Sequence, residues 1–189
     1  RWKNSMSEFS LTPQLQLSVE QFYYLEARLL DGRQYQQWFE LVSEDLRYIV
    51  PSRVNVMVNN RDRGNEDMIS IERELESAES EGCPIREEGY LQMMIRVERA
   101  YKMNSWSENP PARTRRLVSN VEILADEDNV LSVISNFHMH YARPGNDNYL
   151  YAGQRRDTLR RVDSSYKIAH REVVLDYANI DYPTIGLFF

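Results

Sequence analysis

The amino-acid sequence predicts an α+β fold in which helices come first and a mostly antiparallel sheet follows. In the first part of the chain, Phe22, Leu25 and Leu29 recur at the spacing of one helix face. After Pro110 and Pro111 the apolar period changes to two, the period of a strand with one buried face. A long sheet with helices on one face curls around them, so its outer face must meet water or a partner.

The first helix is expected over residues 18–31, after an irregular arm over residues 1–17. Ser18 and Gln21 match a capping box, and Gly32 is a typical stop signal. The same patterns predict, further along the chain, a short helix over 33–44, a strand over 45–50, a polar loop over 59–70, a weak acidic helix over 71–81 and a stronger helix over 87–103.

The second half of the chain is expected to be a run of long strands joined by tight turns. Trp106 and the following Asn109, Pro110 and Pro111 should form a rigid corner before the first of these strands, because two prolines fix φ and exclude helix. The strands are predicted over 113–124, 131–141, 148–162 and 166–177, and residues 18–189 are expected to form a single domain.

Composition excludes several classes of protein. The net charge of −6 argues against a nucleic-acid binder, which needs a basic surface to neutralise phosphates. No apolar run is long enough for a membrane span. One cysteine, Cys83, cannot form an internal disulfide or a multi-thiolate metal site. A cytoplasmic protein is the simplest interpretation.

Three ordered blocks of sequence carry a family resemblance. They are FYYLEARLLD at 22–31, WSENPPARTRRLVSNV at 106–121 and AGQRRDTLRR at 152–161, and the end Phe188-Phe189 is similar too. At this spacing the chain resembles the small β subunit of aromatic-ring-hydroxylating (Rieske-type) dioxygenases, in the group that acts on biphenyl, naphthalene and other polycyclic aromatic hydrocarbons. It departs from many relatives at Ala112 and Arg116, where serine and histidine are common.

The resemblance implies a cone of N-terminal helices wrapped by a strongly curved sheet, similar to the cystatin-like fold of ketosteroid isomerases. It implies a hexamer of three α and three β subunits, in which the α subunit holds a Rieske 2Fe-2S cluster and a mononuclear iron. The α subunit would add both atoms of O2 to an aromatic ring, using NAD(P)H electrons delivered by a reductase and a ferredoxin. This chain itself would then be non-catalytic and carry no cofactor.

The amino-acid sequence itself tests whether this chain could hold either iron centre. A Rieske centre needs two cysteines and two histidines, and the chain has one cysteine. A mononuclear iron needs two histidines and a carboxylate. His138 and His140 share one face of a strand, and Asp157 or Asp176 could lie nearby. The alternative is that both histidines lie on the polar outer face of the sheet as hydrogen-bonding residues.

A stand-alone cone-fold enzyme is a second hypothesis, and a plain binding module is a third. A dehydratase or isomerase would need an acid and a base in a pocket lined by the inner sheet face. The candidates are His170, Asp157 and Tyr166.

The arginine pairs offer a last candidate site. Strand alternation places neighbouring arginines on opposite faces, so they do not form one phosphate-binding stripe. We expect Arg113, Arg115, Arg155 and Arg156 to pair with carboxylates within the chain or across subunits, because the guanidinium fork binds carboxylates bidentately.

Overall fold

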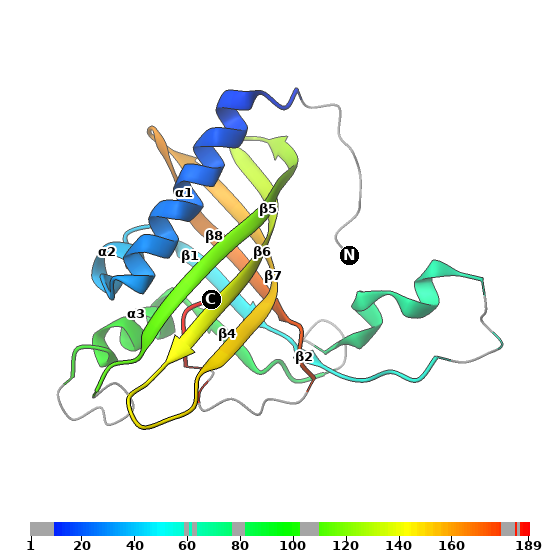
Figure 1. Cartoon of the computed structure of the whole chain (residues 1–189). Helices are drawn as coiled ribbons and strands as arrows, with labels where there is room; N and C mark the ends of the chain where they lie inside the picture. Colours follow the sequence, from blue (N-terminus) through cyan, green and yellow to red (C-terminus); the bar gives the residue numbers. More distant parts are fainter. Residues whose placement is uncertain are drawn as a thin grey trace.

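The computed structural model describes residues 10–58, 61, 64–76, 82–102, 110–178, 184 and 186–189. Figure 1 shows a strongly curled sheet with the helices on its concave side. The six-stranded sheet has the order β4-β1-β8-β7-β6-β5, and only β1 and β8 are parallel neighbours. Its strands are β1 (Val42–Val50), β4 (Arg86–Gly89), β5 (Arg113–Glu127), β6 (Val130–Ala142), β7 (Tyr149–Val162) and β8 (Ser165–Leu175).

Helix α1 (Pro13–Asp31) begins five residues before the expected position, so the end of the predicted arm is helical. The cap is Thr12, whose Oγ1 accepts a hydrogen bond from the amide of Leu15 at 3.2 Å. Pro13 is compatible with the first helical turn, because the amide hydrogen it lacks has no partner there. Ser18 instead donates its hydroxyl to the carbonyl of Leu15 at 2.8 Å.

The other two helices are shorter than predicted. Helix α2 (Tyr35–Phe39) stops before β1, and helix α3 (Tyr90–Arg99) starts after β4. In both cases sheet pairing takes over residues whose local pattern fits a helix: β4 pairs with β1, and β1 also pairs with β8.

The region 52–76 differs most from expectation. Residues 71–81 were predicted as a weak helix, but the described part forms a 3₁₀ turn over Ile71–Glu74 and the short strand β3 (Leu75–Glu76). This strand pairs with β2 (Ser52–Arg53), and a second 3₁₀ turn covers Glu66–Ile69 within the expected loop. Tertiary pairing of β2 with β3 therefore outweighs the local helical preference.

The four long strands agree with the sequence prediction within a few residues. The corner before them is only partly described: Trp106 and Asn109 lie outside the described residues, whereas Pro110 and Pro111 are exposed immediately before β5. Within the described residues no helix is long and apolar enough to cross a membrane.

Helix α1 lies along β5, the long edge strand of the sheet (Figure 1). Its side chains bond to backbone groups of that strand. Gln16 donates its Nε2 hydrogen to the carbonyl of Val121 at 2.9 Å, and Asp31 Oδ2 accepts from the amide of Arg116 at 2.8 Å. The helix therefore supplies hydrogen-bond partners that a further strand would otherwise provide.

Candidate functional site

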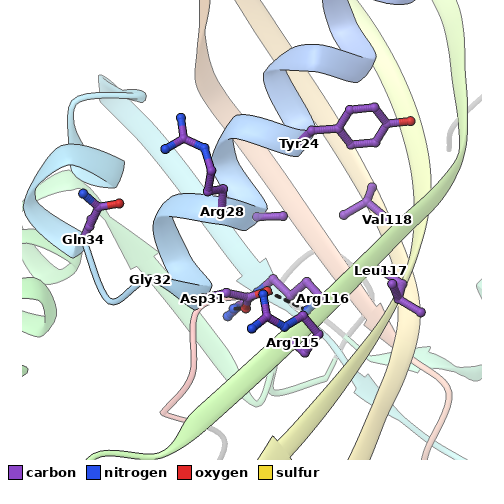
Figure 2. A pocket seen from close by; sticks show the side chains of 10 residues that line it. Tyr24, Arg28, Asp31, Gly32, Gln34, Arg115, Arg116, Leu117 and Val118 are labelled. Carbon is purple, nitrogen blue, oxygen red and sulfur yellow. Dashed lines mark hydrogen bonds and ion pairs between the residues drawn. The ribbon is translucent and has the colours of Figure 1, made fainter.

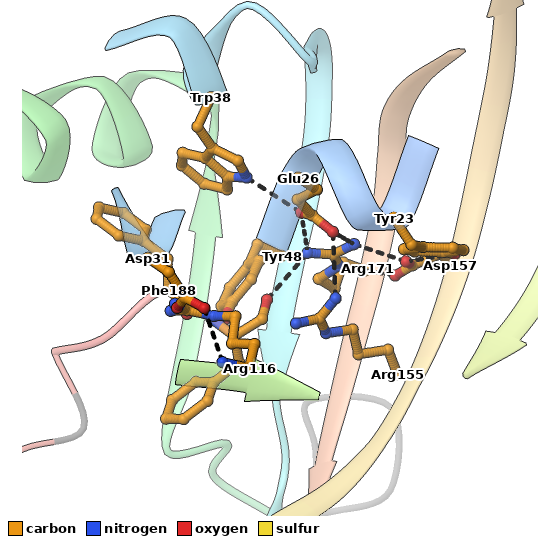
Figure 3. A network of polar contacts seen from close by, with 11 residues as sticks. Tyr23, Glu26, Asp31, Trp38, Tyr48, Arg116, Arg155, Asp157, Arg171 and Phe188 are labelled. Atoms are coloured by element: carbon orange, nitrogen blue, oxygen red, sulfur yellow. Dashed lines mark hydrogen bonds and ion pairs between the residues drawn. The ribbon is translucent and has the colours of Figure 1, made fainter. Parts of the chain in front are cut away.

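The interior of the cone contains four fully buried charged residues, which we call the buried charge cluster: Glu26, Arg155, Asp157 and Arg171. Figure 3 shows that they come from α1, β7 and β8 and point toward one another. Two carboxylates face two guanidinium groups, so the cluster is neutral overall. This balance is what makes burial of the four charges tolerable.

Glu26 is the centre of the cluster. It accepts hydrogen bonds from Arg171 Nη1 at 2.6 Å and Nη2 at 3.1 Å, from Arg155 Nη1 at 3.1 Å and from Trp38 Nε1 at 3.0 Å. Burial would raise the pKa of this carboxyl, but Arg171 and Arg155 outweigh burial and lower the pKa to about 2. Glu26 is therefore a permanent anion and is unsuited to proton transfer near neutral pH.

Both carboxylate oxygens of Asp157 are also occupied. Arg171 donates from Nε at 2.8 Å and from Nη2 at 2.7 Å, and Tyr23 donates its hydroxyl at 2.8 Å. Burial, followed by the charge of Asp157, raises the pKa of Tyr23 well above its usual value. Tyr23 thus remains a protonated donor, and the contacts of Asp157 are structural.

The acid–base set proposed from sequence is not assembled. Asp157 lies opposite Arg171 on the inner face of the sheet, whereas His170 lies opposite Thr158 on the other face. The hydroxyl of Tyr166 lies 2.7 Å from Ser18 Oγ. The hypothesis that His170, Asp157 and Tyr166 share a pocket is therefore wrong. His170 lies on the opposite face from Asp157, and the register shift between Ile168 and His170 turns it away from Tyr166, which strict alternation would have placed on the same face.

The residues considered as iron ligands, in a chain expected to hold no metal, are also divided between the two faces. His138 and His140 are exposed on the outer face of β6, and Asp157 is inside. His138 and Asp176 line one small hollow of about 220 Å³, but Asp176 is paired with Arg53 at 3.3 Å. In the described ranges no three His, Cys, Asp or Glu side chains are grouped closely enough to hold a metal ion.

A larger groove of about 550 Å³ lies between α1 and β5 (Figure 2). Tyr24, Arg28 and Leu117 are on its walls, and the carboxylate at its floor is Asp31. Both oxygens of Asp31 accept hydrogen bonds, from the backbone and side chain of Arg116 and from the hydroxyl of Thr114. The carboxylate of the groove is therefore already bonded within the chain.

The arginines proposed as pairing residues fall into two groups. Arg155 belongs to the buried charge cluster, and Arg156 faces outward to pair with Glu172 at 3.1 Å. Arg113 and Arg115 are exposed at the start of β5. Contacts of these two residues with another subunit remain a prediction.

Sequence reasoning missed Glu26, Arg171, Tyr23 and Trp38 as members of one network. One signal was present: Glu26 falls on the same helical face as Phe22 and Leu29, where a carboxylate is unexpected. The partner arginine could not be identified from alternation, because the register of β8 shifts between its pairings with Thr158 and Leu159.

A curled sheet packed on helices, with a buried charge cluster inside a hydrophobic core, defines a cone-fold protein without an assembled acid–base site among its described residues. A sequence model of the ring hydroxylating beta subunit family matches residues 25–182, and the chain belongs to that family. It is 34% identical over 183 residues to the benzene 1,2-dioxygenase subunit beta of Pseudomonas putida, covering 95% of this chain and 91% of that relative. It is 33% identical over 180 residues to the biphenyl 2,3-dioxygenase subunit beta of Rhodococcus jostii, covering 94% and 90%.

Solved structures show the same fold. A chain of naphthalene 1,2-dioxygenase with indole bound matches with a TM-score of 0.79 at 24% identity, covering 97% of this chain and 90% of that one. A putative scytalone dehydratase from Novosphingobium aromaticivorans matches with a TM-score of 0.60 at 15% identity, covering 92% and 91%.

These comparisons confirm the resemblance and the cone-like α+β fold predicted from sequence. They support a β subunit of an aromatic-ring-hydroxylating dioxygenase over a stand-alone dehydratase. The dioxygenase activity belongs to the oxygenase complex of which such a subunit is part.

Proposed function

We propose that this chain is the non-catalytic assembly subunit of a terminal oxygenase that cis-dihydroxylates an aromatic hydrocarbon. In this proposal three copies support three α subunits in the cytoplasm. Each α subunit carries the Rieske 2Fe-2S cluster and the mononuclear iron, and receives NAD(P)H-derived electrons through a reductase and a ferredoxin.

The observation that carries the proposal is the occupied interior. A cone-fold enzyme needs an open pocket with an available acid or base. Here Glu26 and Asp157 are the buried carboxylates of the inner face, and each has both oxygens bonded to arginine and aromatic donors. The interior therefore stabilises the fold, which is consistent with chemistry performed on a partner.

The outer face supports an assembly role. In the register of the sheet, Arg115 lies opposite His140, which lies opposite Leu150, and Leu117 lies opposite His138. We call these five residues the outer patch. Leu117 is 68% exposed and Leu150 is 47% exposed. Exposed apolar side chains among arginine and histidine are typical of a polar but occupied interface.

Expression of the α subunit with and without this chain tests the assembly role. We expect the α subunit alone to retain its metal centres but to lose the hexameric mass and aromatic turnover. A metal-loaded α trimer that turns over at the rate of the complete complex would refute the proposal.

A pair of matched variants tests the outer patch. Leu117→Asp should reduce co-purification with the α subunit or the hexameric mass, because a charge in an interface core is strongly unfavourable. Leu91→Asp on α3 is the control, since Leu91 is similarly exposed at 65% and lies outside the patch. Equal assembly of the two variants would exclude the outer patch as an interface.

A further inference from the structure

Residues 186–189, Gly-Leu-Phe-Phe, enter the cone, and we call them the Phe-Phe segment. Its four residues belong to no helix or strand, and both phenylalanines are buried. The C-terminus lies on the concave side of the sheet in Figure 1. The segment thus fills space that no regular element occupies.

The rest of the molecule holds this segment by its backbone. Arg96 of α3 donates from Nη2 to the carbonyl oxygens of Gly186 at 3.1 Å and Leu187 at 2.8 Å. Arg116 of β5 donates from Nη2 to the carbonyl oxygen of Phe188 at 2.5 Å. Side chains from two separate elements therefore bind three successive carbonyls.

The last residue has two backbone contacts. Arg171 donates from Nη1 to the backbone oxygen of Phe189 at 2.9 Å, and the Phe189 amide donates to the hydroxyl oxygen of Tyr48 at 3.2 Å. Figure 3 shows Tyr48 and Phe188 beside the buried charge cluster. Arg171 thus connects the segment to Glu26 and Asp157.

The two rings occupy different aromatic pockets. The ring of Phe188 lies 4.7 Å from that of Trp38 and 5.3 Å from that of Tyr35, with the Arg96 guanidinium 4.5 Å from its centroid. Such ring contacts and cation–π geometry are selective for an aromatic side chain.

The ring of Phe189 packs against aromatic rings of β6 and β7. It lies 5.5 Å from the ring of Tyr151 and 5.8 Å from that of Phe137. The guanidinium of Arg155 lies over the ring of Phe137, 5.2 Å from its centroid. The Nε and Nη2 atoms of Arg155 have no hydrogen-bond partner in the described structure. The site therefore holds two buried N–H donors of Arg155 that its present contacts do not use.

We propose that the cone contains a peptide-binding site for two adjacent aromatic residues, and that the Phe-Phe segment is its intramolecular ligand. Main-chain carbonyls bound by arginines, together with two aromatic side-chain pockets, are the features by which a receptor recognises an extended peptide. The segment contributes no sheet pairing, so it can leave the site while the strands remain paired. An aromatic peptide supplied separately then occupies the same site.

The test uses the full chain with Phe188→Ala and Phe189→Ala, which removes both rings. The remaining backbone is then held by the arginine contacts alone, and a separate peptide that also fills the two aromatic pockets displaces it. Thermal unfolding is measured with the synthetic peptide Gly-Leu-Phe-Phe and with Gly-Leu-Ala-Ala as the control. We expect the aromatic peptide, at about a hundredfold excess over its Kd, to raise the Tm of the variant by about 5–10 °C. The control peptide should have no effect, and the unsubstituted chain should not respond because its site is occupied.

A folded variant that does not respond to Gly-Leu-Phe-Phe would overturn the proposal, as would an equal response of the unsubstituted chain. Should the variant fail to fold, hydrogen exchange on the unsubstituted chain decides. We expect the amide of Phe189 to exchange at least about tenfold faster than the amide of Val173 in β8, because the segment opens separately from the sheet. Equal exchange rates would show that the segment is an inseparable part of the core.

Discussion

Replacing Glu26 with glutamine removes one charge from the buried charge cluster while preserving the size of the side chain. The variant removes the carboxylate that Arg155 and Arg171 share, and Asp157 pairs only with Arg171 among the contacts of these two arginines. Breaking a buried ion pair by removing one partner costs about 3–5 kcal/mol, because the remaining charge is uncompensated.

The pKa of Glu26 gives a second route to the magnitude. Its lowering from 4.5 to about 2 corresponds to about 3 kcal/mol of preferential stabilisation of the charged form. Because the folded-state pKa lies below the unfolded value, this contribution is complete above about pH 4.5 and is lost as the pH falls toward 2. The cost of breaking a buried ion pair and the stabilisation derived from the pKa of Glu26 agree in magnitude. Glu26→Gln should therefore lower the Tm of a chain of this size by about 6–20 °C.

Urea unfolding at pH 7 and at pH 3 measures the effect. Glu87→Gln is the matched control, since Glu87 pairs with Arg47 at 3.2 Å on the surface, where both side chains are about 40% exposed. An exposed pair contributes at most about 1 kcal/mol. The reasoning fails if Glu26→Gln costs no more than Glu87→Gln at pH 7, or if the difference between the two variants does not shrink at pH 3.

Three further outcomes are expected. Tyr23→Phe should cost about 1.5–3 kcal/mol in urea unfolding by removing the charge-assisted hydrogen bond to Asp157, whereas Tyr24→Phe, on the exposed side of α1, should be near neutral. Gly153→Ala should lower the free energy of unfolding by about 1–3 kcal/mol, because the added Cβ would lie 2.3 Å from a backbone oxygen of β8. Gly89→Ala is the control and should lower it less, because the nearest contact of its Cβ is 3.3 Å; equal losses would contradict the close backbone approach at Gly153. Metal analysis of the purified chain should find no stoichiometric iron, given one cysteine and three histidines.

The long strands were predictable from sequence because their apolar residues alternate over many positions. In β6, Leu131, Val133, Phe137 and Met139 all face the interior as the pattern requires. The short elements were not predictable, because pairing across the sheet decides them. Residues 87–89 belong to the predicted helix over 87–103 but pair with β1 as part of the edge strand β4.

In the buried charge cluster, too, local sequence pattern predicts some features and tertiary packing decides the others. The inward position of Arg155 and the outward position of Arg156 follow from strand alternation. The meeting of Arg155 with Glu26, 129 residues earlier in the chain, depends on how α1 lies across the sheet. No local pattern contains that information, and a shift in strand register hid Arg171 as well.

The contacts between α1 and β5 bear on how the chain survives in a crowded cell. A long edge strand with open amide and carbonyl groups is a template on which a second chain can add its own strand, and aggregation begins in this way. Gln16 and Asp31 occupy such groups on β5, and the opposite edge, β4, has only four residues. Two of the open backbone groups of β5 are thereby already bonded within the chain, so loss of Gln16 or Asp31 should increase the fraction of the chain that aggregates during expression.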